Sequence, residues 1–396
     1  MTGKVIQVWL IVANLLPIGD LHEARPLLFH CGSLLGVVAN GICRSTRGCS
    51  DRTCAGTGAA IAAPDQPQQF HVYQSRIYAD RRPIHLFGLN WSGLETRDRA
   101  PHGLWAGRSL QDYFAQIKQA GFTAIRLPVS TDVLDDSKKV ADWAQEAGYG
   151  PTGLKMLTQT VDAAARVGLW GVLGYNGYDS KVSGGDAPAP YARDGSYKVE
   201  DWLNDLARMS QFAQQRQYVV GIDLFNEPHG ISWSEWKGLA ERGGQQVLRY
   251  NPRLLVFVQG VAETRTDTAG YGTFWGSNFV EARRRPINNA MIPAHKLVLS
   301  PHVYGPDAYM MPHLKKEGYP LNFHAIWDAY FKHMASSNGV CAGEFGGKYR
   351  HCSKDANWQD AFVSYMNQRR GMSYRWFYWQ FNPISGDTGG VLGEDW

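Results

Sequence analysis

Short apolar runs alternate with longer amphipathic segments along the chain from Phe70 onward. Apolar runs of this length, bounded by Gly, Pro or polar residues, are typical of buried strands, whereas the amphipathic segments have a helical period. The pattern predicts eight strands, at residues 85–90, 124–128, 169–174, 219–225, 254–259, 297–302, 340–344 and 376–379. It also predicts helices between them, among which are 109–120, 153–167, 199–216 and 233–250. Strands that alternate with helices favour a parallel sheet.

Polar or aromatic side chains stand at or near the C-terminal ends of these predicted strands. The set is Asn90, Arg126, Asn226, Glu227, His302, Glu344 and Trp379. With 396 residues, 44% hydrophobic content and no long linker, the chain favours one large domain. We therefore predict an α/β fold of the (β/α)8 TIM-barrel class, in which the C-terminal strand ends share one rim and carry the site.

Two of these residues are carboxylic acids in similar settings. Glu227 follows an apolar run and precedes Pro228, which cannot donate to a sheet, so Glu227 should project from a strand tip. Glu344 follows a second short run and precedes Phe345 and two glycines. A pair of acids on one rim is typical of glycoside hydrolysis, in which one acid protonates the leaving oxygen and the other acts at the anomeric carbon.

Composition adds two points. The net charge of +4 is too small to indicate a nucleic-acid partner, and the basic run 283–285 is interpreted as a solvated loop. The chain has 14 Trp and 19 Tyr, more than packing usually requires, and flat aromatic faces suit sugar rings. No HExxH or comparable ligand spacing occurs, so we expect no metal and no cofactor.

The first 63 residues differ from the rest. An apolar run at 5–18 resembles a signal sequence but is too short and interrupted for a membrane span, and a small-residue cluster at 59–63 lies far downstream of it. Either the export signal begins inside this leader, with 27–39 as its apolar part, or the natural start lies elsewhere. We expect a mature protein that begins near Pro64, is secreted and has no membrane partner.

Cysteine usage agrees weakly with export. Four of the six Cys fall in the leader, at spacings that match no common zinc pattern. The other two, Cys341 and Cys352, flank Glu344. They could form a disulfide in an oxidising compartment, and two separate thiols are an equal alternative.

From about Phe70 to Trp396 the chain resembles glycoside hydrolase family 5, in its bacterial endoglucanase (cellulase) branch. The motifs that carry the resemblance, in the order of the family, are LNWSGLET (89–96), HGLW (102–105), IRLP (125–128), DLFNEPH (223–229), SPHVYGPD (300–307), GEFGG (343–347) and YWQFNP through DTGG (378–390). The resemblance implies a barrel that hydrolyses internal β-1,4 bonds of glucans with retention. It further implies Glu227 as acid/base and Glu344 as nucleophile, in a protein that we expect to be monomeric.

The resemblance also implies substrate-binding residues. Arg126, which is expensive to bury alone, is expected to pair with Glu344, although an ordinary structural ion pair is the alternative. Asn226 is expected to bind the sugar 2-hydroxyl, and a turn-forming Asn is its alternative. His302 would contact sugar while Tyr304 would orient the nucleophile. Trp379 is expected to form the floor beneath the cleaved sugar, with Trp275 and Trp105 as outer platforms, although Trp105 could equally cover the barrel wall.

The chain departs from the family at three places. Asn176 stands where the family carries a His, so we expect an altered sugar contact without charge, and the segment 180–197 matches poorly. The chain stops 17 residues after Trp379, so a final closing helix of the family is expected to be missing. No linker or separate cellulose-binding module is visible. The alternative functions are another glycanase on this scaffold, namely a mannanase, xyloglucanase or β-1,3-glucanase, and a carbohydrate-binding pseudoenzyme.

Overall fold

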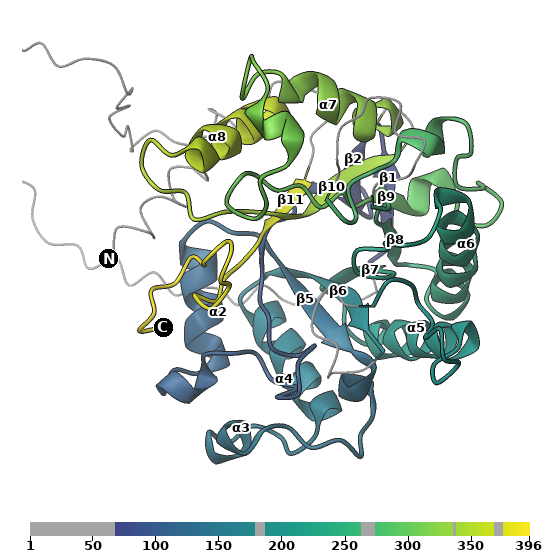
Figure 1. The fold of residues 1–396 in the computed structure, drawn as a ribbon. Coiled ribbons are helices and arrows are strands. Elements are labelled where there is room, and N and C mark those ends of the chain that lie inside the picture. Colours follow the sequence, from purple (N-terminus) through teal and green to yellow (C-terminus); the bar gives the residue numbers. More distant parts are fainter. Residues whose placement is uncertain (1–67, 179–186, 263–273, 336–337, 368–374) are drawn as a thin grey trace, which may run out of the picture. The chain divides into compact units, whose positions relative to one another are not determined.

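The computed structural model describes residues 68–178, 187–262, 274–335, 338–367 and 375–396 (Figure 1). The expected leader, its boundary near Pro64 and its four cysteines lie outside the described residues. Part of the poorly matching segment 180–197 lies outside them as well. These expectations therefore stay predictions.

Eight parallel strands form a closed barrel, which confirms the predicted fold class. Each strand pairs with its neighbours in chain order, and the last pairs with the first. The strands are β4 (Phe87–Asn90), β5 (Ala124–Ser130), β6 (Trp170–Gly177), β7 (Val219–Asp223), β8 (Leu255–Val258), β9 (Leu297–Leu299), β10 (Gly339–Phe345) and β11 (Arg375–Tyr378). All eight predicted strands are present, with ends that differ by a few residues.

Helices surround the barrel (Figure 1). The α-helices are α2 (Leu110–Gln119), α3 (Asp142–Glu146), α4 (Gly153–Arg166), α5 (Val199–Gln214), α6 (Trp233–Tyr250), α7 (Phe323–Tyr330) and α8 (Lys354–Asn367). Short 3-10 turns are η1 (Leu104–Ala106), η2 (Thr131–Leu134), η3 (Val280–Arg283), η4 (Ala294–Lys296), η5 (Pro312–Lys315) and η6 (Lys332–Met334). The four helices named from the sequence, α2, α4, α5 and α6, are confirmed. The sequence analysis gave no bounds for α3, α7 and α8.

Hydroxyl side chains fix where three of the predicted helices begin. Ser109 precedes α2 and accepts a hydrogen bond from the backbone N–H of Asp112, whose carboxylate accepts from the Ser109 N–H in return. Thr152 and Ser232 cap α4 and α6 by accepting hydrogen bonds from the N–H groups of Lys155 and Glu235. Such caps satisfy backbone N–H groups that the helix itself leaves without an acceptor.

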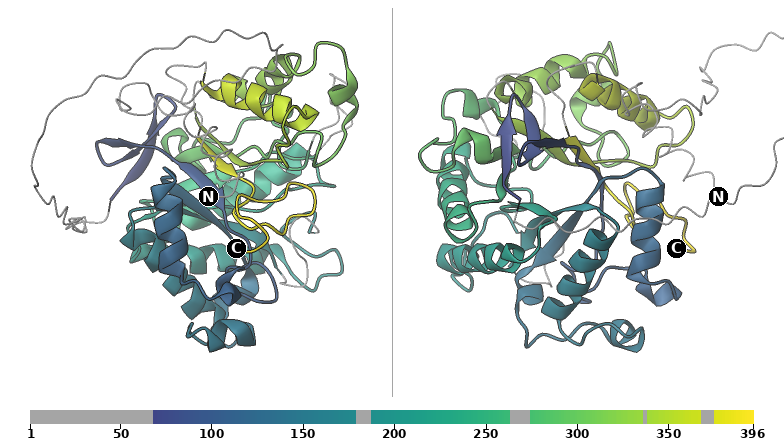
Figure 2. Two further views of the ribbon diagram at one scale, coloured as in Figure 1. Left: turned by 90° about the vertical axis from the view of Figure 1, so that its left-hand side faces the viewer. Right: turned by 180° about the vertical axis from the view of Figure 1, so that it is seen from behind.

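A small antiparallel sheet covers the N-terminal end of the barrel. It consists of β1 (Phe70–Tyr73), β2 (Arg76–Ala79) and β3 (Arg82–Ile84). Its buried face joins one apolar cluster with side chains of the barrel strands, for example Val172, Phe257 and Phe377. In the left view of Figure 2 this purple sheet lies on the opposite side from the yellow segment after β11. The sequence analysis missed it because strands of three or four residues are too short to show a period.

The sheet leaves the C-terminal ends of the barrel strands open for a site. Within the described ranges, no helix combines the length and the apolar character needed to cross a bilayer.

We predict that the small sheet stabilises the barrel. Phe70 is fully buried and meets the Trp170 ring edge to face at 5.8 Å. Phe70→Ala should lower the free energy of unfolding by about 3–5 kcal/mol, because it removes a large buried side chain and leaves a cavity. Urea unfolding measures the change. Tyr73→Ala is the matched control, because Tyr73 lies in the same strand and is 59% exposed. Equal effects of the two substitutions would contradict the prediction.

Candidate active site

The rim formed by the C-terminal strand ends gathers the predicted polar residues. Asn90 ends β4 and is in register with Arg126 of β5, while His302, after β9, is bridged to Glu344 of β10. Asn176 lies near the end of β6, and Asn226 and Glu227 follow β7. The barrel thus brings together residues that are more than two hundred positions apart in the chain.

Both carboxylate oxygens of Glu344 accept hydrogen bonds from the predicted partners. Arg126 donates from Nη1 to Oε1 at 2.8 Å, and the Tyr304 hydroxyl donates to Oε2 at 2.6 Å. Glu344, Arg126 and Tyr304 are buried, and burial raises the pKa of the Tyr304 hydroxyl so that it remains a donor. These contacts favour the ionised form of the Glu344 carboxyl group.

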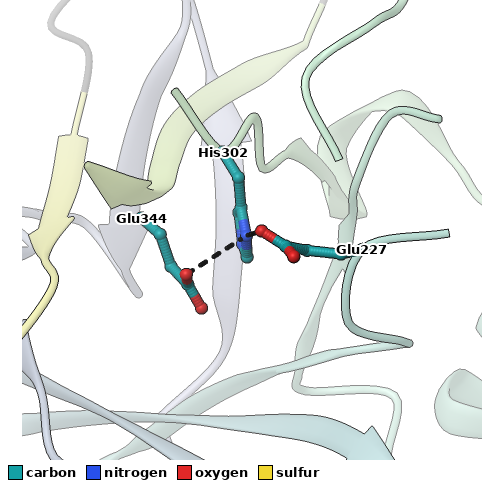
Figure 3. A group of neighbouring side chains, drawn as sticks. All are labelled: Glu227, His302 and Glu344. Carbon is teal, nitrogen blue, oxygen red and sulfur yellow. Dashed lines mark hydrogen bonds and ion pairs between the residues drawn. The ribbon is translucent and has the colours of Figure 1, made fainter. Parts of the chain in front are cut away.

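Glu227 occupies an unusual backbone conformation beside this group. Its φ is 50°, in the left-handed region that non-glycine residues rarely adopt. Its N–H donates to Oε1 of Gln259 at 2.7 Å. Its side chain is 17% exposed, and its Oε1 lies 2.9 Å from Nδ1 of His302. The backbone therefore turns the Glu227 carboxyl group toward His302 and Glu344, as Figure 3 shows.

The two acids are close enough for a retaining mechanism. A carboxylate oxygen of Glu227, a nitrogen of His302 and a carboxylate oxygen of Glu344 all lie within 4.8 Å of one another (Figure 3). Retaining glycosidases hold their two carboxyl groups about 5–5.5 Å apart, whereas inverting enzymes leave room for a water molecule at a larger distance. The geometry therefore favours the retaining arrangement.

The surroundings of the two acids separate their pKa values. Burial raises the pKa of Glu227 well above its usual range, and the negative charge of Glu344 raises it further. Burial also raises the pKa of Glu344, but there the charge of Arg126 and the Tyr304 hydrogen bond oppose the rise. The two carboxyl groups titrate as a coupled pair. The proton resides mainly on Glu227, because Arg126 and Tyr304 donate hydrogen bonds to Glu344 and stabilise its ionised form.

His302 contacts both acids as a neutral ring. Its Nδ1 lies 2.9 Å from Oε1 of Glu227 and 3.4 Å from Oε2 of Glu344. Burial lowers the pKa of His302 well below its usual range, and the nearby Arg126 charge lowers it further. A neutral His adds a hydrogen bond between the acids without adding a charge.

The same three residues could in principle supply ligand atoms to a cation. However, hydrogen bonds from Arg126 and Tyr304 already engage both oxygens of Glu344, and the buried guanidinium would repel a cation. The donor set fits paired carboxyl chemistry better than metal coordination.

Asn226 and Trp379 lie next to the catalytic candidates. The Asn226 side-chain oxygen is 3.5 Å from Nη2 of Arg126, and its N–H donates to the Tyr175 carbonyl at 2.9 Å. The Trp379 N–H donates to the carbonyl of Phe345, which directly follows Glu344, at 2.8 Å. Both residues are therefore placed beside the acids.

The other predicted aromatic and amide residues differ in exposure. Trp275 is 42% exposed and Trp105 is 44% exposed. Trp105 meets the rings of Trp143 and Trp396 edge to face, at 4.9 Å and 5.0 Å, so it belongs to an aromatic cluster with side chains from α3 and from the segment after β11. Asn176 is buried in β6 next to Tyr175.

The structure adds site residues that the sequence analysis missed. Asp223 is buried and accepts hydrogen bonds from both Nε and Nη2 of Arg126, at 3.1 Å and 2.9 Å. The side-chain amide of Gln259 donates to the same Asp223 oxygen at 2.9 Å. A carboxylate in DLFNEP was visible in the sequence, but its contact with Arg126 spans 97 positions, which no local pattern reveals.

Gly174 makes room for Arg126. A Cβ atom at this position would lie 3.0 Å from Nη2 of Arg126, closer than such atoms normally approach. The guanidinium therefore packs directly on the β6 backbone.

The possible disulfide between Cys341 and Cys352 does not form. Cys341 is buried in β10, whereas Cys352 is exposed on the loop that follows, and the two are not bonded to each other. The alternative of two separate thiols is therefore correct. Burial also raises the pKa of the Cys341 thiol, so it stays protonated.

Comparison with known proteins decides the family. The model of the cellulase family, glycosyl hydrolase family 5, matches residues 78–385. The chain belongs to glycosyl hydrolase family 5. Its similarity to members of this family extends over most of the chain.

Two curated relatives illustrate the similarity. The chain is 36% identical to the major extracellular endoglucanase of Xanthomonas campestris pv. campestris, over 83% of this chain and 68% of that protein. It is 33% identical to an endoglucanase of Paenibacillus polymyxa, over 83% of each.

Solved structures of family 5 enzymes agree. An endocellulase from Pyrococcus horikoshii, in a complex with cellotetraose, superposes with a TM-score of 0.76 at 32% identity, over 84% of this chain and 96% of that one. The catalytic domain of the Xanthomonas campestris endoglucanase gives a TM-score of 0.75 at 35% identity, over 82% and 95%.

We predict that Asp223 sets the pKa of Glu344 in this family 5 site. The Asp223 charge raises the pKa of Glu344, against the larger lowering effect of Arg126. Asp223→Asn removes this charge, so the Glu344 pKa should fall and the ionised form should persist to lower pH. A carbon-13 NMR titration of glutamate-labelled protein measures the shift, with Glu344→Gln to assign the signal.

The matched control is Asp162→Asn, which removes a half-exposed carboxylate that pairs with Arg216 at 3.7 Å on the outside of the barrel. It should leave the Glu344 signal unchanged. An unchanged or raised Glu344 pKa in Asp223→Asn would contradict the prediction that the Asp223 charge raises the pKa of Glu344.

Proposed function

We propose that the protein is a retaining endo-β-1,4-glucanase in which Glu227 is the acid/base and Glu344 is the nucleophile. The observation that carries this proposal is the pair of carboxyl groups within 4.8 Å, of which only Glu344 is held by Arg126 and Tyr304. This asymmetry leaves Glu344 ionised and Glu227 protonated, as the first step of a double displacement requires.

In the first step Glu344 attacks the anomeric carbon and forms a glycosyl ester. The bond from that carbon to the leaving oxygen breaks, and Glu227 transfers its proton to this oxygen. In the second step water attacks the same carbon, Glu227 accepts the proton of the water, and Glu344 is released.

The pKa of Glu227 follows this cycle. Its high value in the resting enzyme depends in part on the negative charge of Glu344. That charge disappears when Glu344 becomes an ester, so the Glu227 pKa falls and the residue becomes a base. One carboxyl group can therefore serve as acid and then as base.

Several residues around the pair are proposed to bind the substrate. Asn226 would hydrogen-bond the sugar 2-hydroxyl, His302 would contact sugar, and Asn176 would donate a hydrogen bond to sugar from the position of the family His. Trp379 would stack beneath the cleaved sugar, and Trp275 and Trp105 would contact sugars further along the glucan. Tyr304 and Arg126 act on the Glu344 oxygens directly.

The relatives support a glucan substrate and secretion. The two curated relatives described above are endoglucanases, one of which is named as extracellular, and the Pyrococcus enzyme binds cellotetraose. We propose secretion for this chain on the same ground, together with its signal-like leader.

We predict rapid viscosity loss and reducing-sugar release on carboxymethyl cellulose and barley β-glucan, and little activity on mannan or laminarin. Glu344→Gln keeps the shape of the side chain but removes the nucleophile, so kcat should fall by at least about 10³-fold. Glu281→Gln, on the turn η3 outside the barrel rim, is the control. Activity on mannan or laminarin alone would assign another glycanase. A folded protein that binds one polymer but cleaves none would favour the pseudoenzyme.

We also predict that Asn176 binds sugar. Asn176→Ala should lower kcat/KM on cello-oligosaccharides by about 2- to 10-fold, the loss expected for one hydrogen bond. Asn176→His keeps a donor and should recover most of this loss. Steady-state kinetics on cellopentaose measure both variants, and equal activity of Asn176→Ala and the unchanged protein would remove Asn176 from the site.

A further inference from the structure

His229 stands between the loop of Glu227 and the loop of Trp275. Its ring lies flat against the Trp275 ring, with the centroids 3.8 Å apart and the planes 7° from parallel. The other side of Trp275 is accessible, since this residue is 42% exposed. The stack therefore fixes the plane that Trp275 presents.

The same His229 ring holds the backbone of Glu227. Nδ1 of His229 lies 2.8 Å from the Glu227 carbonyl oxygen. A carbonyl oxygen only accepts, so Nδ1 carries the proton and donates it. The Glu227 N–H is held on the opposite side by Gln259, at 2.7 Å. These two contacts fix the peptide groups on both sides of a residue whose φ of 50° is unfavourable in itself.

The Trp275 loop is also tied to the remaining site residues. The Gly276 carbonyl accepts hydrogen bonds from the N–H groups of Gly260 and His302, at 2.8 Å and 3.4 Å. The ring of Phe274 meets Tyr304 edge to face at 5.7 Å. Trp275 thus presents its exposed face from a loop that is fixed against the same residues that surround the acids.

We propose that His229 is a positioning residue that fixes the sugar-stacking plane of Trp275 and the backbone of the acid/base Glu227 at the same time. Glu227 protonates the leaving oxygen, and Trp275 stacks on the residue two positions after Glu227, so we assign a sugar on Trp275 to the leaving group. The His229 ring then sets the position of a leaving-group sugar on Trp275 relative to the proton donor Glu227. This inference rests on the proposed function and adds to it the role of His229.

The two functions of His229 can be separated by substitution. Phe keeps a flat ring beneath Trp275 but cannot donate to the Glu227 carbonyl. Asn places an N–H donor at about the reach of Nδ1 but has no ring. Ala removes both. His295→Ala is the matched control, because His295 is exposed on η4, next to the N-terminal end of β9.

The full-length variants are compared on cellopentaose and on 2,4-dinitrophenyl β-cellobioside, whose leaving group departs without a proton. On cellopentaose, His229→Asn should raise KM by about 2- to 10-fold with little change in kcat, since it loses only the aromatic plane. His229→Phe should lower kcat by about 10-fold or more with little change in KM, because a small misplacement of the acid/base is costly. His229→Ala should show both effects, and His295→Ala neither.

The aryl glycoside separates positioning from general damage. The rapid first release of dinitrophenolate should stay within about 3-fold in all variants, because this step needs neither the acid nor the Trp275 sugar. The second step should slow in His229→Phe, and azide, which attacks without a general base, should restore turnover.

Three outcomes would overturn the proposal. They are unchanged kinetics in His229→Phe and His229→Asn, identical kinetic changes in these two variants, or an equal loss of the first release in all three His229 variants, which would mark a purely structural role. A wild-type protein that is inert on cellopentaose would overturn the proposed function and this inference with it. If the wild-type protein is active on cellopentaose and the His229 variants have unchanged kinetics, the inference alone is overturned.

Discussion

The site depends on the buried guanidinium of Arg126, which is shared between Glu344 and Asp223. A buried cation is costly unless it is paired and fully hydrogen-bonded, and here Asn90 also accepts from it at 2.9 Å. Its partners come from different strands, so the guanidinium can be satisfied only when the barrel is closed. The absence of a side chain at Gly174 gives it space. Closure of the fold and assembly of the site are therefore one event.

This shared cation explains why two buried acids can differ in protonation. Burial alone raises the pKa of both Glu227 and Glu344, and equal acids so close together would share one proton without preference. The donors on Glu344 break the symmetry. Asp223 also pairs with Arg126, and its negative charge offsets part of the lowering of the Glu344 pKa by Arg126. Glu344 therefore stays basic enough for the proposed attack. The proposed nucleophile and the proposed acid have identical side chains, and only their neighbours make them differ.

The site also depends on loops that follow the strands. Glu227 lies beyond the last residue of β7, and its conformation is maintained by contacts from Gln259 and His229 rather than by a sheet. Gln259 itself links this loop to Asp223, below it in the barrel. Glu227 is thus connected to Arg126 through Gln259 and Asp223, so residues of the strands and of the loops share one hydrogen-bond network.

The sequence alone determined the eight strands and the two acids, because alternating apolar runs and a strand-ending Glu-Pro are local signals. It did not determine the small sheet at 70–84, which is too short to show a period, or the state of Cys341 and Cys352. It also could not reveal that Asp223 contacts Arg126 or that His229 contacts Glu227 and Trp275. Their partners are brought near only when the barrel closes, and contacts between distant residues leave no local pattern. Tertiary structure decided these features because pairing distances and burial, not residue types, set them.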